Sequence, residues 1–326
     1  MRAAPGTNHD LAEPGPPLLV NAWLGIAVFI LLFSSISYTL RAILLAVIGR
    51  ADRIATVPLT YAILNVGSHS ASSVTITSID TIPTQLIFLI SLLLTARILA
   101  RLEKREPSSY GIGRVRLTDG IKGGAVGLIL MAFLVGSLVV CHSVALGPCS
   151  TLSGGSMFGG TLWLIAFFLI SFVEEFLIRG YILVTLARGL RDNVKFSRFR
   201  NDSFTFGIAS ICTSVIFAAR HLGNPNITRL GVCSLFMFGL LCCFTFWRSG
   251  ALWWAIGFHA AWDWSQAFLF GLPSSGIYSA PHWCAARIFN DRIISGGLFG
   301  PEGSLLTLPV LIVGYLLARL TLKDTR

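Results

Sequence analysis

Three short polar clusters lie inside stretches of sequence that are otherwise strongly apolar. They contain Glu174, Glu175 and Arg179, then His221, and then His259 and Asp263. An ionisable side chain at membrane depth is costly unless it pairs with another group or lines a water-filled cavity. We therefore take these residues as the candidate functional site.

The first cluster combines a helical ion pair with a second carboxylate. Glu175 and Arg179 are four residues apart, so on a helix they share one face and can pair. That pair alone could equally be a buried contact that fixes helix packing. Glu174 lies about 100° around the helix, and a second carboxylate in a medium of low dielectric has a raised proton affinity. This property suits a general acid or base.

The other two clusters supply imidazole groups. Phe217 and His221 share a helical face, so the phenyl ring can support the imidazole, although a lone histidine at this position is more often a packing residue. His259 and Asp263 are also four apart, so the carboxylate can hold the ring in one tautomer. The alternative is a His–Asp pair that joins two helices.

Together the clusters predict a hydrated pocket inside the membrane. A carboxylate and an imidazole can activate water there, and a hydrogen-bond donor can stabilise an oxyanion, which is what amide hydrolysis requires. The sequence has no Gly-x-Ser-x-Gly pattern that would indicate a serine nucleophile.

Composition predicts that membrane helices carry these clusters. Of 326 residues, 54% are hydrophobic and 12% charged, and the mean hydropathy is +0.74, whereas about a quarter of the residues of a soluble protein are charged. The fold expected is all-α and polytopic, with about eight transmembrane helices. The apolar segments span 18–40, 83–99, 123–140, 161–186, 204–219, 230–247, 252–270 and 305–320. We expect tails at 1–17 and 323–326, three N-terminal helices within 18–150 and a catalytic membrane core within 151–322.

Charged residues predict the orientation. With a cytoplasmic N-terminus, the inner loops hold most lysines and arginines, and the outer loop 141–160 has no charge. Both termini are thus expected in the cytoplasm, and no organellar or retention signal is evident, which favours the plasma (inner) membrane of a bacterium. The net charge of +10 does not indicate nucleic-acid binding, because no aromatic-basic module accompanies it. Cys149 and Cys284 both fall in outer loops, where a disulfide is possible.

The ordered set of motifs resembles the CPBP family, which comprises type II CAAX prenyl endopeptidases and bacteriocin-processing or Abi-type proteases. The matching residues are Glu174-Glu175-x-x-x-Arg179, Phe217-x-x-x-His221 and His259-x-x-x-Asp263, and the segment Phe299-Gly-Pro-Glu-Gly-Ser304 is similar as well. The resemblance covers about 161–320. It implies an eight-helix intramembrane glutamate protease whose site opens to the cytosol and whose substrate is a membrane-associated peptide or protein.

The resemblance also implies roles for individual residues. Glu174 would be the general base, helped by His221, and His259 would contribute to the oxyanion hole. Glu175 and Arg179 would shape the site. CAAX-processing members are similar to one another in having asparagine where this chain has Asp263, and an ionised aspartate cannot donate to an oxyanion. Asp263 is then expected to orient His259 or to be protonated, and the departure leaves CAAX-type processing of prenylated substrates and leader-peptide processing both open.

Counting residues along the spans reveals a conflict of depth. His221 falls toward the outer end of the fifth span, and His259 falls nearer the cytoplasmic end of the seventh. A common pocket therefore requires a fifth helix that is tilted, broken or displaced along the membrane normal.

Three alternatives remain open at this point. No cofactor is expected, but Glu174, Glu175, His221, His259 and Asp263 would also make a plausible divalent site, such as zinc, in a metal-dependent protease. The His-Glu-x-x-His spacing is absent. The same groups could relay protons in a transporter, or belong to a non-catalytic immunity or scaffold protein.

Overall fold

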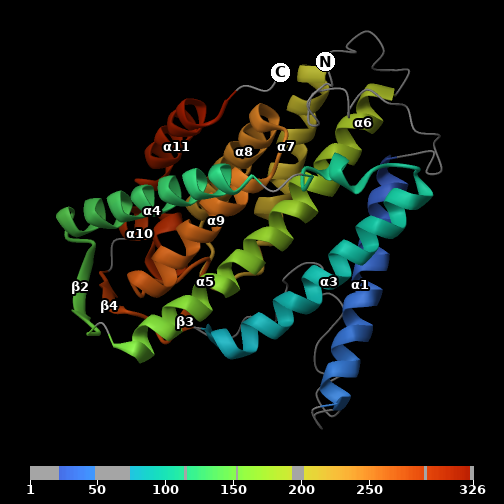
Figure 1. Cartoon of the computed structure of the whole chain (residues 1–326). Helices are drawn as coiled ribbons and strands as arrows, with labels where there is room; N and C mark the ends of the chain where they lie inside the picture. Colours follow the sequence, from blue (N-terminus) through green and yellow to red (C-terminus); the bar gives the residue numbers. More distant parts are fainter. Residues whose placement is uncertain are drawn as a thin grey trace.

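The structure is a computed structural model that describes residues 22–47, 74–113, 116–151, 153–192, 202–289 and 292–323. All eight predicted apolar segments coincide with helices in these ranges (Figure 1). Six helices are long and apolar enough to cross a membrane: α1 (Ala22–Val47), α3 (Ser78–Leu102), α4 (Leu117–Val140), the continuous stretch Gly154–Arg191, α7 (Asp202–Arg220) and α8 (Arg229–Ser249). The protein is therefore a polytopic, mostly helical membrane protein. The predicted N-terminal tail lies outside the described residues.

Two further apolar helices are shorter. α11 (Thr307–Thr321) has 15 residues, and α9 (Trp253–Trp264) has 12 but continues into the π-helix η6 (Ser265–Leu269). A second π-helix, η4 (Phe176–Leu183), joins α5 (Gly154–Glu175) to α6 (Val184–Asp192). Each π-helix begins within two residues of a candidate carboxylate, Glu175 or Asp263. π-Helical turns are rare and frequent at functional sites, because they shift the side chains that follow.

Four short strands lie at one end of the bundle, which we call the strand face (Figure 1). β1 (Val74–Thr77) pairs in parallel with β3 (Ile277–Ala280), and β2 (Val144–Cys149) pairs antiparallel with β4 (Cys284–Ile288). β1 directly precedes α3, β2 follows α4, and β3 and β4 follow η6. The start of α3 and the ends of α4 and η6 therefore lie at this face. The turn between α7 and α8 joins them, since the side-chain amide of Asn224 donates to the carbonyl of Ser275 (3.0 Å).

The opposite end of the bundle, which we call the basic face, is held by contacts between other helix ends. The Lys122 ammonium donates to the Thr321 carbonyl (3.1 Å), and the Arg248 guanidinium donates to the Leu322 carbonyl (3.1 Å). These contacts bring the start of α4 and the ends of α8 and α11 together. The start of α1 belongs to the same half, because the Tyr181 hydroxyl donates to the carbonyl of Gly25 (3.3 Å).

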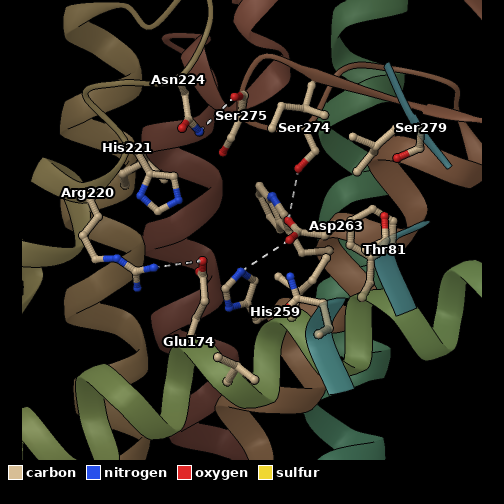
Figure 2. A pocket seen from close by; sticks show the side chains of 18 of the residues that line it. Thr81, Glu174, Arg220, His221, Asn224, His259, Asp263, Ser274, Ser275 and Ser279 are labelled. Atoms are coloured by element: carbon tan, nitrogen blue, oxygen red, sulfur yellow. Dashed lines mark hydrogen bonds and ion pairs between the residues drawn. The ribbon is translucent and has the colours of Figure 1, made fainter. Parts of the chain in front are cut away.

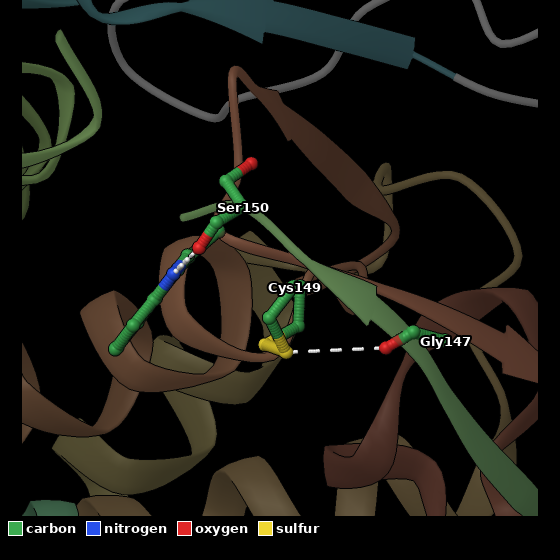
Figure 3. The surroundings of a disulfide bond; sticks show 5 residues. Gly147, Cys149 and Ser150 are labelled. Atoms are coloured by element: carbon green, nitrogen blue, oxygen red, sulfur yellow. Dashed lines mark hydrogen bonds between the residues drawn. A yellow bond between two sulfur atoms is a disulfide. The ribbon is translucent and has the colours of Figure 1, made fainter. Parts of the chain in front are cut away.

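A disulfide joins Cys149 to Cys284 across the β2–β4 pair on the strand face (Figure 3). The sequence allowed this disulfide without deciding it, and in the structure it is formed. The indole of Trp283 donates to the carbonyl of Ser150 (2.6 Å) beside it. The bond ties the connection between α4 and α5 to the segment that follows η6.

Thiol counting checks this bond. The chain has seven cysteines, five of which are free in the structure. We expect the denatured, unreduced protein to take five maleimide tags and the denatured, reduced protein to take seven. The Cys284→Ser variant should take six under both conditions. Seven tags on the unreduced wild-type chain would contradict the bond.

Backbone contact between α4 and α9 fixes the helix that carries His259. A Cβ atom added to Gly123 would lie 2.1 Å from the carbonyl oxygen of Trp254, and one added to Gly257 would lie 2.1 Å from that of Gly120. Only glycine lets two helix backbones approach this closely.

Substitution of Gly123 should therefore displace α9. We expect Gly123→Ala to destabilise the protein by about 1–3 kcal/mol through overpacking and to lower activity, because His259 moves with the helix. Gly136→Ala is the matched control on the same helix, because nothing lies within 4 Å of its added Cβ. Thermal unfolding in detergent measures both variants, and equal melting temperatures would contradict the packing argument.

Candidate functional site

A cavity of about 420 Å³ lies within the helical bundle (Figure 2). Glu174 of α5, His221 after α7, and His259 and Asp263 of α9 all line it. The structure thus brings together four of the six predicted residues from three separate parts of the chain. Glu175 and Arg179 do not line the cavity.

The depth conflict is resolved by the position of the turn between α7 and α8. α7 ends at Arg220, and the turn that follows is covered by the segment before β3, where a Cβ atom on Gly276 would lie 2.0 Å from the carbonyl oxygen of Pro225. His221 is accordingly only 8% exposed. The cavity reaches from the end of α7 to the middle of α9, so the two histidines line it together despite the difference in their positions along the spans.

Glu174 faces a cation that the sequence did not single out. Its Oε1 lies 4.0 Å from a terminal nitrogen of Arg220, the last residue of α7 (Figure 2). Arg220 directly precedes His221, so the same helix end presents a guanidinium and an imidazole to the cavity. A positive charge at this distance favours the ionised form of the carboxylate, which is the form that can accept a proton.

His221 has one ring nitrogen committed to the backbone. Its Nδ1 lies 2.7 Å from the carbonyl oxygen of Phe217. A carbonyl only accepts, so Nδ1 carries the proton, and in the neutral ring Nε2 is then free of hydrogen. The rings of Phe217 and His221 have centroids 4.8 Å apart, which agrees with the predicted support of the imidazole by the phenyl ring.

The Glu175–Arg179 pair lies behind the cavity. Both side chains are 0% exposed, and the guanidinium donates to Glu175 Oε1 (3.1 Å), as their spacing predicted. The Arg179 guanidinium also lies 4.3 Å from the centroid of the Phe217 ring. The pair therefore connects α5 with α7, the helix that ends directly before His221.

His259 lies between two carboxylates. Its Nδ1 is 2.9 Å from Glu175 Oε1, and its Nε2 is 3.4 Å from Asp263 Oδ2. The contact with Asp263 agrees with the predicted helical pair, whereas the contact with Glu175 joins residues 84 positions apart and was not predicted. A neutral imidazole has one N–H, so donation to both carboxylates requires the imidazolium form.

Glu302 extends the acidic cluster and was missed by the sequence analysis. The Ser274 hydroxyl lies 3.5 Å from Asp263 Oδ1 and 3.2 Å from Glu302 Oε1. Glu302 also accepts from Gln266 (3.0 Å) and Ser275 (2.8 Å). A signal was present in the segment Phe299-Gly-Pro-Glu-Gly-Ser304, but it lies outside the predicted spans, where an acidic residue is unremarkable.

Burial raises the pKa of Glu302 to about 7, and the nearby Asp263 carboxylate acts in the same direction. A carboxyl group whose pKa is higher in the folded state binds more protons there, so it stabilises the fold at low pH and loses this effect as pH rises from about 4.5 to about 7. We expect Glu302→Gln to remove up to about 3 kcal/mol of pH-dependent stability. Melting temperatures at pH 5 and pH 8 check this. If the melting temperature of Glu302→Gln differs between pH 5 and pH 8 by as much as that of the wild type, the assignment is contradicted.

The arrangement can perform acid-base chemistry on a bound water. Glu174 and His221 supply proton acceptors, and His259 supplies a donor from the neighbouring helix. Among the residues that the structure describes, no group of three or more His, Cys, Asp or Glu side chains is arranged to hold a metal ion. The acids and imidazoles contact one another, Arg179 and Arg220 instead.

Comparison with known proteins bears on the same segment. No curated protein and no solved structure matches the chain. A family model described as Rce1-like, type II CAAX prenyl endopeptidase, matches residues 157–265, a range that contains all six predicted site residues. Glu302 lies beyond it. Residues 157–265 therefore match the Rce1-like family of type II CAAX prenyl endopeptidases, which is the family that the three motifs resemble.

Proposed function

We propose that this protein is an intramembrane endopeptidase in which Glu174, helped by His221, activates a water molecule for attack on a peptide carbonyl. One observation carries the proposal: Glu174, His221, His259 and Asp263 come from three separate parts of the chain and line the same cavity of about 420 Å³. The match of residues 157–265 to a peptidase family supports it.

The reaction begins with water between Glu174 and Nε2 of His221. As the water oxygen bonds to the carbonyl carbon, Glu174 accepts one of its protons, and negative charge develops on the carbonyl oxygen. Glu174 then delivers the proton to the leaving nitrogen as the carbon–nitrogen bond breaks, giving a carboxylic acid and a free amine. The positive charge of Arg220 keeps Glu174 ionised before the attack.

His259 is the donor proposed for the oxyanion. Its Nδ1 is held by Glu175 at 2.9 Å, and its longer contact of 3.4 Å with Asp263 lets Nε2–H turn toward developing charge. Asp263 acts as an acceptor that orients the ring, because an ionised carboxylate cannot itself donate. This role differs from the asparagine of CAAX-processing proteins, so the proposal covers peptide hydrolysis and leaves out prenyl specificity.

The substrate proposed is a membrane-associated peptide or protein segment. Apolar side chains that include Phe33, Phe88, Phe167 and Ile170 line the cavity together with its acids and imidazoles. An apolar lining of this kind accommodates the side chains of a peptide held near lipid, while the polar groups contact its backbone.

Comparative proteomics of membranes tests the proposal. Cells that carry the Glu174→Gln variant should accumulate membrane peptides that wild-type cells cleave, and purified wild-type protein should cleave those peptides in detergent. Absence of both results would refute a protease. Stoichiometric bound metal whose removal by a chelator abolishes cleavage would replace this mechanism with a metal-dependent one.

A further inference from the structure

The cavity extends from the middle of the bundle, where Glu174, Leu177 and His259 line it, to the strand face. Further lining residues lie in the first half of α3, of α8 and of α11, and at the end of α7. All these helix portions adjoin the strand face. Residues of β1 and β3, including Thr75, Ile76 and Ser279, line the cavity as well.

A packed aromatic layer lies in the part of the bundle that continues toward the basic face. Along the continuous helical stretch Gly154–Arg191 the last lining residue is Leu177, in η4. All residues 175–188, which continue toward the basic face, are buried. The layer consists of Phe29, Tyr110, Phe176 and Tyr181, each 0% exposed. Ring centroids are 3.8 Å apart for Phe29 and Tyr181, 5.4 Å for Tyr110 and Tyr181, and 6.1 Å for Tyr110 and Phe176. These rings pack against one another, and among the described residues none of the four lines the cavity.

Two independent features assign compartments to the two faces. The disulfide between Cys149 and Cys284 lies on the strand face, and disulfides persist in oxidising compartments outside the cytoplasm. Lysines and arginines that flank the helix ends concentrate at the basic face, as they do in cytoplasmic loops. They include Lys104, Arg105, Arg116, Lys122, Arg191 and Arg248. Both features make the strand face extracytoplasmic.

We propose that the cavity opens to the extracytoplasmic side and takes a membrane-anchored polypeptide whose scissile bond lies on that side of the bilayer. This inference rests on the proposed peptidase function. It departs from the cytosolic opening that the family resemblance implies, and it excludes cytosolic prenylated chain ends as substrates. The substrate class is instead an exported segment, such as a leader or juxtamembrane peptide, that remains attached to the membrane.

Thiol labelling of the full-length protein in intact cells tests the orientation. Cys141 is free and exposed at the end of α4, on the strand face. Cys233 is free and exposed as well, so both cysteines are replaced by serine in the background. In it, Thr75→Cys places a probe at the cavity lining and Ser108→Cys places a matched probe on the basic face. A membrane-impermeant maleimide should label wild type and Thr75→Cys in intact cells, and should label Ser108→Cys only after permeabilisation. The reverse pattern would overturn the inference.

A pair of anchored reporters separates failure of this inference from failure of the protease proposal. Each reporter carries the same cleavable peptide beside one transmembrane span, on the extracytoplasmic side in one and on the cytoplasmic side in the other. Cleavage of only the first, abolished by Glu174→Gln, is expected. Cleavage of only the second, also dependent on Glu174, would overturn the orientation but support the protease. If neither is cleaved while the labelling is as expected, the peptidase proposal and the substrate class fail, and only the orientation stands.

Discussion

The Glu174→Gln substitution is expected to lower kcat for peptide cleavage by about 10²–10⁴-fold, which is the range that a positioned general base contributes. Glutamine has nearly the same size and shape as glutamate but cannot accept the proton of the attacking water. The fold should survive, because the substitution removes only the contact between Glu174 Oε1 and the Arg220 guanidinium, whose atoms are 4.0 Å apart. Initial rates with a peptide identified by proteomics measure the effect.

Two controls make this result specific to the proposed base. Glu106→Gln removes an exposed carboxylate at the basic face, and its activity should equal that of the wild type. Melting temperatures of both variants should stay close to the wild-type value. If Glu174→Gln retains more than about one third of wild-type activity, a general-base role for this carboxylate is refuted, and another group must accept the proton.

Features that depend on the local geometry of one helix could be predicted from the sequence. The pairs Glu175–Arg179 and His259–Asp263 are each four residues apart, and both form contacts in the structure. Apolar runs likewise marked the membrane helices that the structure describes, because lipid requires a continuous apolar surface. Both kinds of prediction depend only on periodicity and length.

Contacts between distant parts of the chain could not be predicted in this way. Glu175 meets His259 across 84 residues, and Glu174 meets Arg220 across two helices. The π-helix η4, which begins directly after Glu175, changes the direction of the side chains that follow, and regular helical counting does not include it. The family resemblance indicated that the motifs meet, but it did not identify Arg220 or Glu302 as neighbours.

The strands illustrate a second limit. The weakly apolar, Ser/Thr-rich segment 49–82 is compatible by sequence with either a loop or a partial helix. In the structure 74–77 forms β1 and α3 begins at Ser78, while 48–73 lies outside the described residues. Four- to six-residue strands have too few positions for a clear alternation of side chains. The β2–β4 pair also depends on the Cys149–Cys284 bond, which the sequence left undecided.

The Arg179→Met substitution should produce the largest loss of stability. It leaves the Glu175 carboxylate buried with only His259 as a charged neighbour, and breaking a buried ion pair by removing one partner costs about 3–5 kcal/mol. Activity should fall as well, because Glu175 holds Nδ1 of His259 at 2.9 Å. Chemical denaturation in detergent measures the change in the free energy of unfolding.

Companion variants separate lost charge from lost packing. Arg179→Lys keeps the charge but loses the planar guanidinium that lies 4.3 Å from the Phe217 ring centroid, so its stability should be intermediate. The double variant Glu175→Gln with Arg179→Met leaves no unpaired buried charge at these two positions and should recover part of the stability lost in Arg179→Met. Its activity should stay low, because an amide holds the His259 ring less firmly than a carboxylate. A double variant less stable than Arg179→Met would show that the pair acts through packing alone.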